Sequence, residues 1–179
     1  MLAAEATSAW GEWVAGLREW HVFGGLTFDQ RRFQVYRCKV PAFDGGMFGE
    51  STEAYVVETP LVMPKVVARD VAIGRFQRWV RRCETALGRR VDYVAALQYQ
   101  RNGWPHFHPL LDVGRLVDGD IAIMGRLWYE ENGYGRLEVP RDLEAVAKYA
   151  SRYLVRDMAD GDVLLSRLLG HKGEFCIPF

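Results

Sequence analysis

The sequence lacks the features of a membrane protein, a zinc ribbon or a nucleotide-driven motor. No apolar run approaches the roughly 20 residues of a membrane span, and no GxxxxGK[ST] phosphate-binding loop is present. The three cysteines are far apart and form no CxxC pair, which favours a reducing compartment. The first residues lack the pattern of a signal peptide. We therefore expect a cytoplasmic protein with no membrane partner.

The chain also lacks net charge, with 23 basic and 23 acidic residues. This balance counts against a domain whose whole surface attracts nucleic acid, so any such binding needs a localised basic stripe. No internal repeat or low-complexity segment is visible. A length of 179 residues favours one domain, residues 1–179, with a proper core. Aromatic content is high, with six Trp and eight Tyr, and some of these residues are candidates for a role beyond the core, because aromatic faces can stack on exposed bases.

Hydrophobic periodicity predicts an α+β domain with a central antiparallel β-sheet flanked by helices. The expected strands are residues 21–28, 32–40, 54–62, 91–100, 106–113 and 136–139. The expected helices are residues 3–20, 66–87, 118–131, 143–158 and a last one at 163–169. Two glycines inside the first strand, Gly24 and Gly25, indicate a bulge or a close backbone approach. Asp142 is placed to cap the 143–158 helix, whose expected core stripe begins at Leu143.

The most informative stretch is the hairpin around His106 and His108. Residues i and i+2 of a strand share one face, so the two imidazoles point the same way. Asn102-Gly103 supplies a strong hairpin turn signal, and Gln98 or Gln100 on the partner strand can face the same pair. Two imidazoles and one side-chain oxygen make a three-ligand metal site with open positions. Taken alone, a His-x-His pair is more often structural than metal-binding.

A second constellation lies on the 143–158 helix. Tyr149 and Tyr153 are one turn apart on a flank of its core stripe, with Arg152 and Arg156 nearby. Tyrosine suits phosphoryl transesterification, because attack on a phosphodiester gives an aryl phosphodiester of similar energy. A divalent ion can polarise the phosphate, and arginines can hold phosphates and favour the phenolate. The two constellations together predict metal-assisted strand transfer on DNA.

In its order of motifs, the chain resembles the HUH endonuclease superfamily, most closely the rolling-circle replication initiators of small plasmids and phages. The segments that carry the resemblance are Leu26-Thr27-Phe28, His106-Phe107-His108 and Lys148-Tyr149-Ala150-Ser151-Arg152-Tyr153-Leu154-Val155-Arg156. The resemblance covers most of residues 21–156. It implies a ferredoxin-like catalytic domain that nicks and joins single-stranded DNA at a replication origin, leaving a 5′-phosphotyrosine and a free 3′-hydroxyl.

The resemblance also implies roles for individual residues. His106 and His108 would hold Mg²⁺ or Mn²⁺, and Gln98 would take the third ligand position, where many relatives have a carboxylate. Gln100 or Asp112 is a possible substitute. Tyr149 would be the primary nucleophile and Tyr153 the second. Arg152 and Arg156 would act electrostatically, since arginine stays protonated at neutral pH. The implied partners are origin single-stranded DNA and a separate or host helicase and DNA polymerase in a bacterial cell.

Other residues are candidates for DNA contact. Arg75, Arg78 and Arg82 form one stripe of the 66–87 helix, and they either track the DNA backbone or simply face solvent. Arg101 and Trp104 flank the hairpin turn. Two alternatives stay open: a related relaxase or transposase, and a catalytically silent single-strand-binding domain that uses aromatics such as Tyr99 and Trp104.

Overall fold

A five-stranded antiparallel sheet organises the chain in a computed structural model, which describes residues 2–29, 36–39, 54–57, 65–100, 103–150, 152–153 and 162–166. The strand order is β6-β1-β5-β4-β7, and every neighbouring pair is antiparallel. The strands are β1 (Val22–Thr27), β4 (Asp92–Tyr99), β5 (Pro105–Asp112), β6 (Gly135–Glu138) and β7 (Asp162–Leu165). The predicted α+β class is confirmed, with the histidine strand β5 at the centre.

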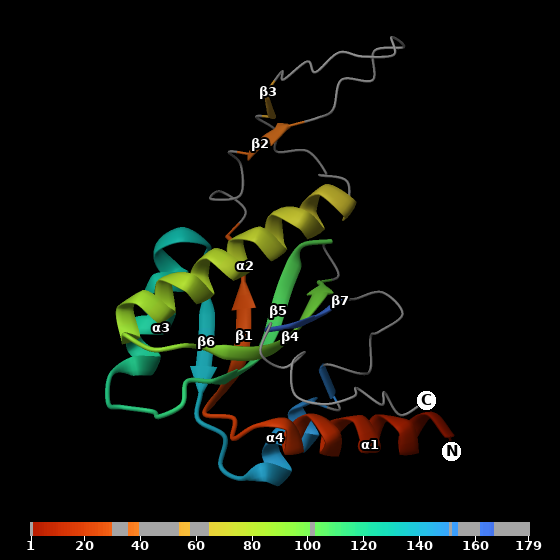
Figure 1. Ribbon diagram of the computed structural model, residues 1–179. Helices are drawn as coiled ribbons and strands as arrows, with labels where there is room; N and C mark the ends of the chain where they lie inside the picture. Colours follow the sequence, from red (N-terminus) through yellow and green to blue (C-terminus); the bar gives the residue numbers. More distant parts are fainter. Residues whose placement is uncertain are drawn as a thin grey trace, which may run out of the picture.

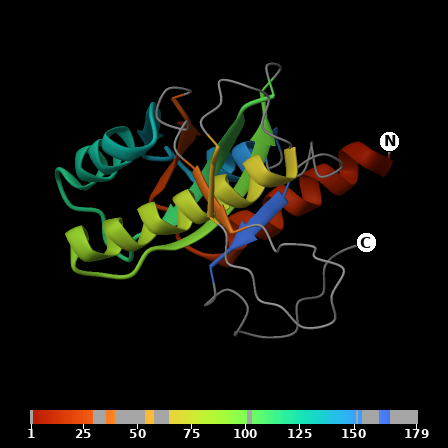
Figure 2. The same cartoon turned by 90° about the horizontal axis from the view of Figure 1, so that it is seen from above.

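Helices cover both faces of this sheet (Figures 1 and 2). They are α1 (Leu2–Leu17), α2 (Lys65–Leu87), α3 (Asp120–Glu131) and α4 (Leu143–Ala150). Helices α2 and α3 pack on one face, and α1 and α4 pack on the other. Side chains alternate between faces along each strand, so β5 sends Phe107 to the α2/α3 face and Leu110 to the α1/α4 face. None of the helices in the described ranges combines the length and apolarity that a membrane crossing requires.

Aromatic side chains fill the α2/α3 face. The Phe76 ring stacks on Phe107 with centroids 4.6 Å apart, and Trp79 meets Trp128 edge-on at 5.5 Å. The Trp79 indole also donates a 2.9 Å hydrogen bond to the Met124 carbonyl, which ties α2 to α3. Each of these four rings is at most 1% exposed. Aromatic pairs of this kind add to the stability gained by area burial, so this face forms the main core.

The local signals in the sequence explain where several elements begin and end. Gly103 has φ 81° and donates a 2.8 Å hydrogen bond to the Gln100 carbonyl, closing the β4–β5 hairpin. Gly88 has φ 65° just after α2, as a helix-ending glycine does. The Asp142 carboxylate accepts a 2.7 Å hydrogen bond from the Ala145 N–H, so this residue caps α4 as predicted.

The glycine pair in β1 marks a close backbone approach. A Cβ atom added at Gly24 would lie 2.0 Å from the Arg136 carbonyl oxygen, a distance that no real side chain tolerates. Strand β6 can therefore pack against β1 at this point only because residue 24 is glycine. The prediction of a close approach is confirmed at Gly24.

Two sequence-based expectations were wrong. The leucine-rich 163–169 segment was expected to be helical, but Asp162–Leu165 is strand β7 beside β4. Val163 packs toward α1 and α4, whereas Leu164 packs toward the opposite cluster, which is the two-residue period of a strand. Leu143, expected in the core, is 65% exposed because it is the first residue of α4.

The predicted strands at 32–40 and 54–62 are shorter than expected. They form a separate two-stranded sheet of β2 (Tyr36–Lys39) and β3 (Ala54–Val57), paired antiparallel. The Gly-rich segment between them, and residues 154–160 at the end of the predicted tyrosine helix, lie outside the described residues.

Candidate active site

The polar residues on the α1/α4 face of the sheet form two rows across neighbouring strands. In one row His106 lies between Gln98 on β4 and Thr27 on β1. In the next row His108 pairs with Ala96 on β4. Opposite residues of an antiparallel pair share one face, so Gln98 and both histidines point toward the side that α4 covers. The sheet register thus brings together the three ligands implied by the resemblance.

The two imidazoles converge. His106 Nε2 and His108 Nε2 are 2.9 Å apart, and the rings meet nearly perpendicularly with centroids 4.7 Å apart. Burial, together with the neighbouring His106, lowers the pKa of His108 to about 4. A neutral imidazole at pH 7 keeps one ring nitrogen as a lone-pair acceptor or metal ligand. His108 is therefore in the protonation state that a metal ligand requires.

The spacing of these nitrogens is compatible with a divalent ion. Two ligands at right angles, each at about 2.1 Å, would be about 3.0 Å apart, close to the observed 2.9 Å. Gln98 is directly opposite His106 and could add its amide oxygen. Among the described residues, no group of three His, Cys, Asp or Glu side chains could hold a metal. A site built from this set would depend on the neutral Gln98.

The alternative third ligands lie differently. Asp112 is four residues beyond His108 on β5, roughly 13 Å away at strand spacing. Its carboxylate pairs with the His21 imidazole at 3.1 Å and accepts from the Gly114 N–H. Gln100 follows the end of β4, where its N–H bonds the Trp104 carbonyl at 2.8 Å. Register therefore favours Gln98 over both.

The two tyrosines pack directly on the histidine pair. The Tyr153 ring stacks on His108 with centroids 4.0 Å apart and an 18° interplanar angle. The Tyr149 hydroxyl lies 3.2 Å from His108 Nδ1 and donates a hydrogen bond to the Gly24 carbonyl. The centroids of the two phenols are 4.8 Å apart. The fold therefore brings His106, His108, Tyr149 and Tyr153 into one continuous contact group.

Gln98 has a second contact that the sequence did not suggest. Its side-chain amide donates a 2.7 Å hydrogen bond to the backbone carbonyl of Tyr153. This bond ties the residues after α4 to strand β4, although Gln98 and Tyr153 are 55 positions apart in the chain. The same side chain is thus positioned to hold Tyr153 in place while its oxygen remains a possible metal ligand.

The Tyr149 phenol is protonated at neutral pH. Burial raises its pKa well above the ordinary value, and Tyr153 and Glu138 add to the rise. Its hydroxyl accepts from His108 Nδ1–H when that nitrogen carries the proton, and it donates to Gly24. In that tautomer the His108 Nε2 lone pair faces His106. A partner on the second ring nitrogen is typical of metal-ligating histidines.

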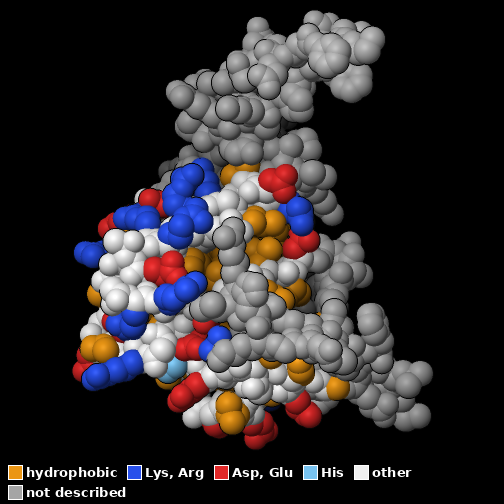
Figure 3. Space-filling model, in the orientation of Figure 1, with side chains coloured by type: hydrophobic (Ala, Val, Ile, Leu, Met, Phe, Trp, Pro, Cys, Tyr) orange, Lys and Arg blue, Asp and Glu red, His pale blue; other side chains and the backbone are white. Residues whose placement is uncertain are grey.

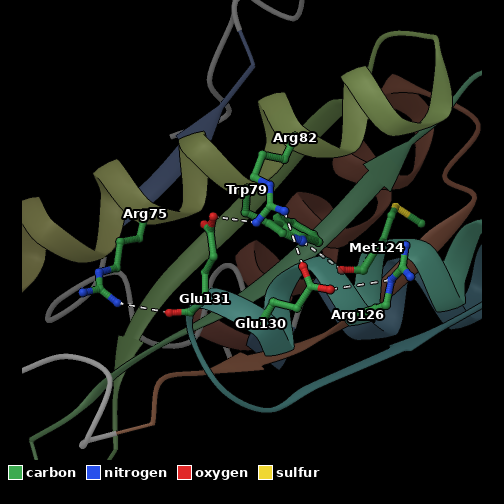
Figure 4. A network of polar contacts seen from close by, with 7 residues as sticks. All are labelled: Arg75, Trp79, Arg82, Met124, Arg126, Glu130 and Glu131. Atoms are coloured by element: carbon green, nitrogen blue, oxygen red, sulfur yellow. Dashed lines mark hydrogen bonds and ion pairs between the residues drawn. The ribbon is translucent and has the colours of Figure 1, made fainter.

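The predicted DNA-contact residues are not all near this group. Arg75, Arg78 and Arg82 lie on α2, across the sheet from the histidines. Figure 3 shows basic side chains gathered over the α2 and α3 side. Figure 4 shows Arg75 bonded to the Glu131 carbonyl and Arg82 paired with Glu130 and Glu131. Two of the three arginines therefore link α2 to α3.

The remaining predicted residues divide into three cases. Arg152 is exposed, with its guanidinium carbon 5.9 Å from the Tyr153 ring centroid. Trp104 is partly buried and packs against the α2/α3-side core. Arg101 and Arg156 lie outside the described residues.

Three groups near the tyrosines were absent from the predicted site: the Gly24 carbonyl, Arg136 and Lys148. With Arg152, the last two line a cleft of about 420 Å³ beside His108 and both tyrosines. The glycine pair in the first strand was the one available signal, since it marked a place of close approach.

Comparisons of the chain with protein-family models, with curated proteins and with solved structures found no match.

Proposed function

We propose that this domain is a metal-dependent nicking and joining endonuclease for single-stranded DNA at a replication origin. The observation that carries the proposal is the contact group of His106, His108, Tyr149 and Tyr153, assembled from a central strand and a late helix. The β5-centred antiparallel sheet, with the tyrosine helix packed on its histidine face, supports a ferredoxin-like HUH arrangement.

The chemistry follows from a tyrosine oxygen beside a potential cation site. The phenol oxygen of the attacking tyrosine would form a bond to the scissile phosphorus, and the bond from phosphorus to the 3′ oxygen would break. The products are a 5′-phosphotyrosine and a DNA 3′-hydroxyl, which takes up a proton and primes synthesis. A divalent ion held by His106, His108 and Gln98 would supply Lewis-acid polarisation of the phosphate. Rejoining is the reverse attack by a 3′-hydroxyl.

The chain's own residues have distinct tasks in this reaction. His108 stays neutral and is oriented through Nδ1 by the Tyr149 hydroxyl. Gln98 anchors the backbone at Tyr153, whose ring stacks on His108. Arg152, exposed near the Tyr153 ring, can stabilise the charge of the transferring phosphate. Tyr149 attacks first in this proposal: its proton, donated to the Gly24 carbonyl before the reaction, passes through solvent to the departing 3′ oxygen, and Tyr153 attacks second.

The direct test is to incubate the protein with single-stranded origin DNA and Mn²⁺ or Mg²⁺. The expected product is a protein–DNA adduct that survives denaturing electrophoresis. Peptide mapping of this adduct then identifies the tyrosine that carries the DNA. An identical incubation in chelator is the control and should give no adduct. Adduct formation in chelator would remove the metal from the mechanism.

The same assay separates the alternatives. A relaxase or transposase of the same superfamily would also form a tyrosine adduct, but on a transfer origin or transposon end instead of a replication origin. A catalytically silent binding domain would bind single-stranded DNA and form no adduct on any sequence. The proposed initiator further needs a separate helicase and a DNA polymerase to extend the 3′-hydroxyl.

A further inference from the structure

Strand β1 has no side chain beside His108. In the β1–β5 register Gly25 lies at the level of His108, and a Cβ atom added there would lie 3.9 Å from His108 Cε1. On its other side Gly25 pairs with Arg136 of β6. The missing side chain leaves a gap on the sheet surface between a histidine of the contact group and an arginine.

This gap is the floor of the cleft of about 420 Å³. Gly24, Gly25, His108, Tyr149 and Tyr153 line it together with residues of β6, and in the sheet Gly25 lies between His108 of β5 and Arg136 of β6. Three cations also line it: Arg136 from β6, Lys148 from α4 and Arg152 just after α4. All three are exposed. A concave surface with several cations beside a phosphoryl-transfer site favours a polyanion.

The acidic residue in the cleft does not cancel this charge. Glu138 pairs with Arg136 on the same strand, and the side chain of Arg136 remains 86% exposed. Ion pairs this open contribute little to stability, so a phosphate can replace the carboxylate as the partner of Arg136. Lys148 and Arg152 are four positions apart and both line the cleft. The cations therefore come from two parts of the fold, β6 and the end of α4, and they share one cleft with the Gly24–Gly25 backbone.

We propose that this cleft holds the sugar–phosphate backbone of the DNA strand next to the scissile phosphate, with Arg136 and Lys148 as phosphate-binding residues and Gly25 as the gap that admits the strand. The inference rests on the proposed function, because it takes the histidine–tyrosine group as the reacting centre. An extended single strand fits better than a compact anion, since the cations come from separate elements, Arg136 from β6 and Lys148 from α4.

The two neighbouring glycines allow a sharp test. Gly24 is required by packing, because any side chain there would collide with the β6 backbone. Gly25 is not, because a methyl group there would make only ordinary van der Waals contact with His108. Gly25→Ala should therefore fold like the wild type, and Gly25→Leu should fill the floor of the cleft.

The experiment measures binding of a fluorescein-labelled oligothymidylate by anisotropy, in chelator so that no cleavage occurs, across a range of salt concentrations. Arg136→Gln and Lys148→Gln should each raise the dissociation constant roughly three- to tenfold, and each should reduce the slope of log affinity against log salt by about 0.7. Gly25→Leu should raise the dissociation constant more than about tenfold, and Gly25→Ala should have a smaller effect. Circular dichroism and thermal melting confirm that each variant is folded.

Arg115→Gln is the matched control. It removes one exposed charge from the segment after β5, seven residues beyond His108, and should leave affinity and salt slope unchanged. The proposal is overturned if Arg136→Gln and Lys148→Gln keep the wild-type slope, if Gly25→Leu binds normally, or if Arg115→Gln loses as much affinity. Wild-type protein that binds through the cleft but forms no adduct with metal would overturn the nuclease function and leave the cleft standing.

Discussion

The two faces of the sheet are made by alternate residues of the same strands, yet they differ in almost every physical property. The α2/α3 face is filled by aromatic rings such as Phe76, Trp79, Phe107 and Trp128, all essentially inaccessible to solvent. The α1/α4 face has a smaller apolar cluster around Leu110 and Val146, beside partly buried histidines and tyrosines and an open cleft. The α2/α3 face holds the larger buried core, whereas the α1/α4 face combines a smaller buried cluster with the polar contact group.

The arginines show the same contrast. On the α2/α3 side, Arg82 pairs with Glu130 and Glu131, so its charge is largely used within the protein. On the α1/α4 side, Arg136 and Lys148 are exposed at the cleft. Abundance of basic residues on a helix therefore does not by itself indicate a binding surface. Arg82 differs from the cleft cations in that its acidic partners lie across a helix interface, whereas the partner of Arg136 lies on its own strand.

The largest effect on activity is expected from His106→Ala. Loss of one imidazole should lower adduct formation by at least about 100-fold, since even residues that only support metal ligands often cost 10- to 100-fold. The measurement is the covalent adduct assay with Mn²⁺, and DNA binding in chelator should persist. His21→Ala is the control, because His21 pairs with Asp112 away from the contact group. An equal loss in the control would contradict the proposed role of His106 as a metal ligand.

The largest effect on stability is expected on the opposite face, from Trp79→Ala. Removing this buried ring and its bond to the Met124 carbonyl should cost about 3–5 kcal/mol of unfolding free energy. Urea denaturation checks the value. His106→Ala should lose far less stability than this variant. Similar losses for both would mean that the two faces contribute equally to the fold.

Phenylalanine variants of the two tyrosines distinguish a nucleophile from a residue that only positions His108. Tyr149→Phe should reduce adduct formation much more than Tyr153→Phe, because Tyr149 is the expected first nucleophile and its hydroxyl also orients His108. Adduct yield and peptide mapping measure the two contributions. If Tyr149→Phe lowers the adduct yield while the DNA in the wild-type adduct maps to Tyr153, Tyr149 is a positioning residue. Equal or reversed losses would contradict the order proposed here.

Acid should destabilise the protein through His108. Its pKa is lowered to about 4 from an ordinary value of 6.5, so the unfolded chain binds this proton first as pH falls. The stabilisation is fully present above pH 6.5 and is lost as pH falls toward 4, by up to about 3 kcal/mol. Urea denaturation at pH 7 and 4.5 should show a larger loss in the wild type than in His108→Gln. Equal losses of stability in the two proteins would contradict a lowered pKa of His108.

The smallest effect is expected from Arg78→Gln. Arg78 is exposed on α2, and this helix lies across the sheet from the contact group. Its removal should change the dissociation constant for single-stranded DNA less than about twofold, well below the effect of Arg136→Gln. An equal or larger loss would show that the α2 stripe follows DNA, as one reading of the sequence predicts.

Local signals were enough for much of the fold and for the shared face of the two histidines. The helical period of residues 66–87, the turn at Gly103 and the cap at Asp142 depend on neighbouring residues only, and all three are present. The shared face of His106 and His108 follows from strand alternation alone. The 163–169 segment failed because a short leucine-rich run suits a helix or a strand, and pairing with β4 decided between them.

The sequence by itself determined the α+β class and the chemical types at the site, because periodicity and spacing are properties of neighbouring residues. Tertiary structure alone decided which groups meet. It placed the Gly24 carbonyl against Tyr149, the Gln98 amide against the Tyr153 backbone, and Arg136 across Gly25 from His108. These contacts join positions 55 to 125 apart or on different strands, and sheet register and helix packing fix them. No local sequence pattern encodes the sheet register or the helix packing.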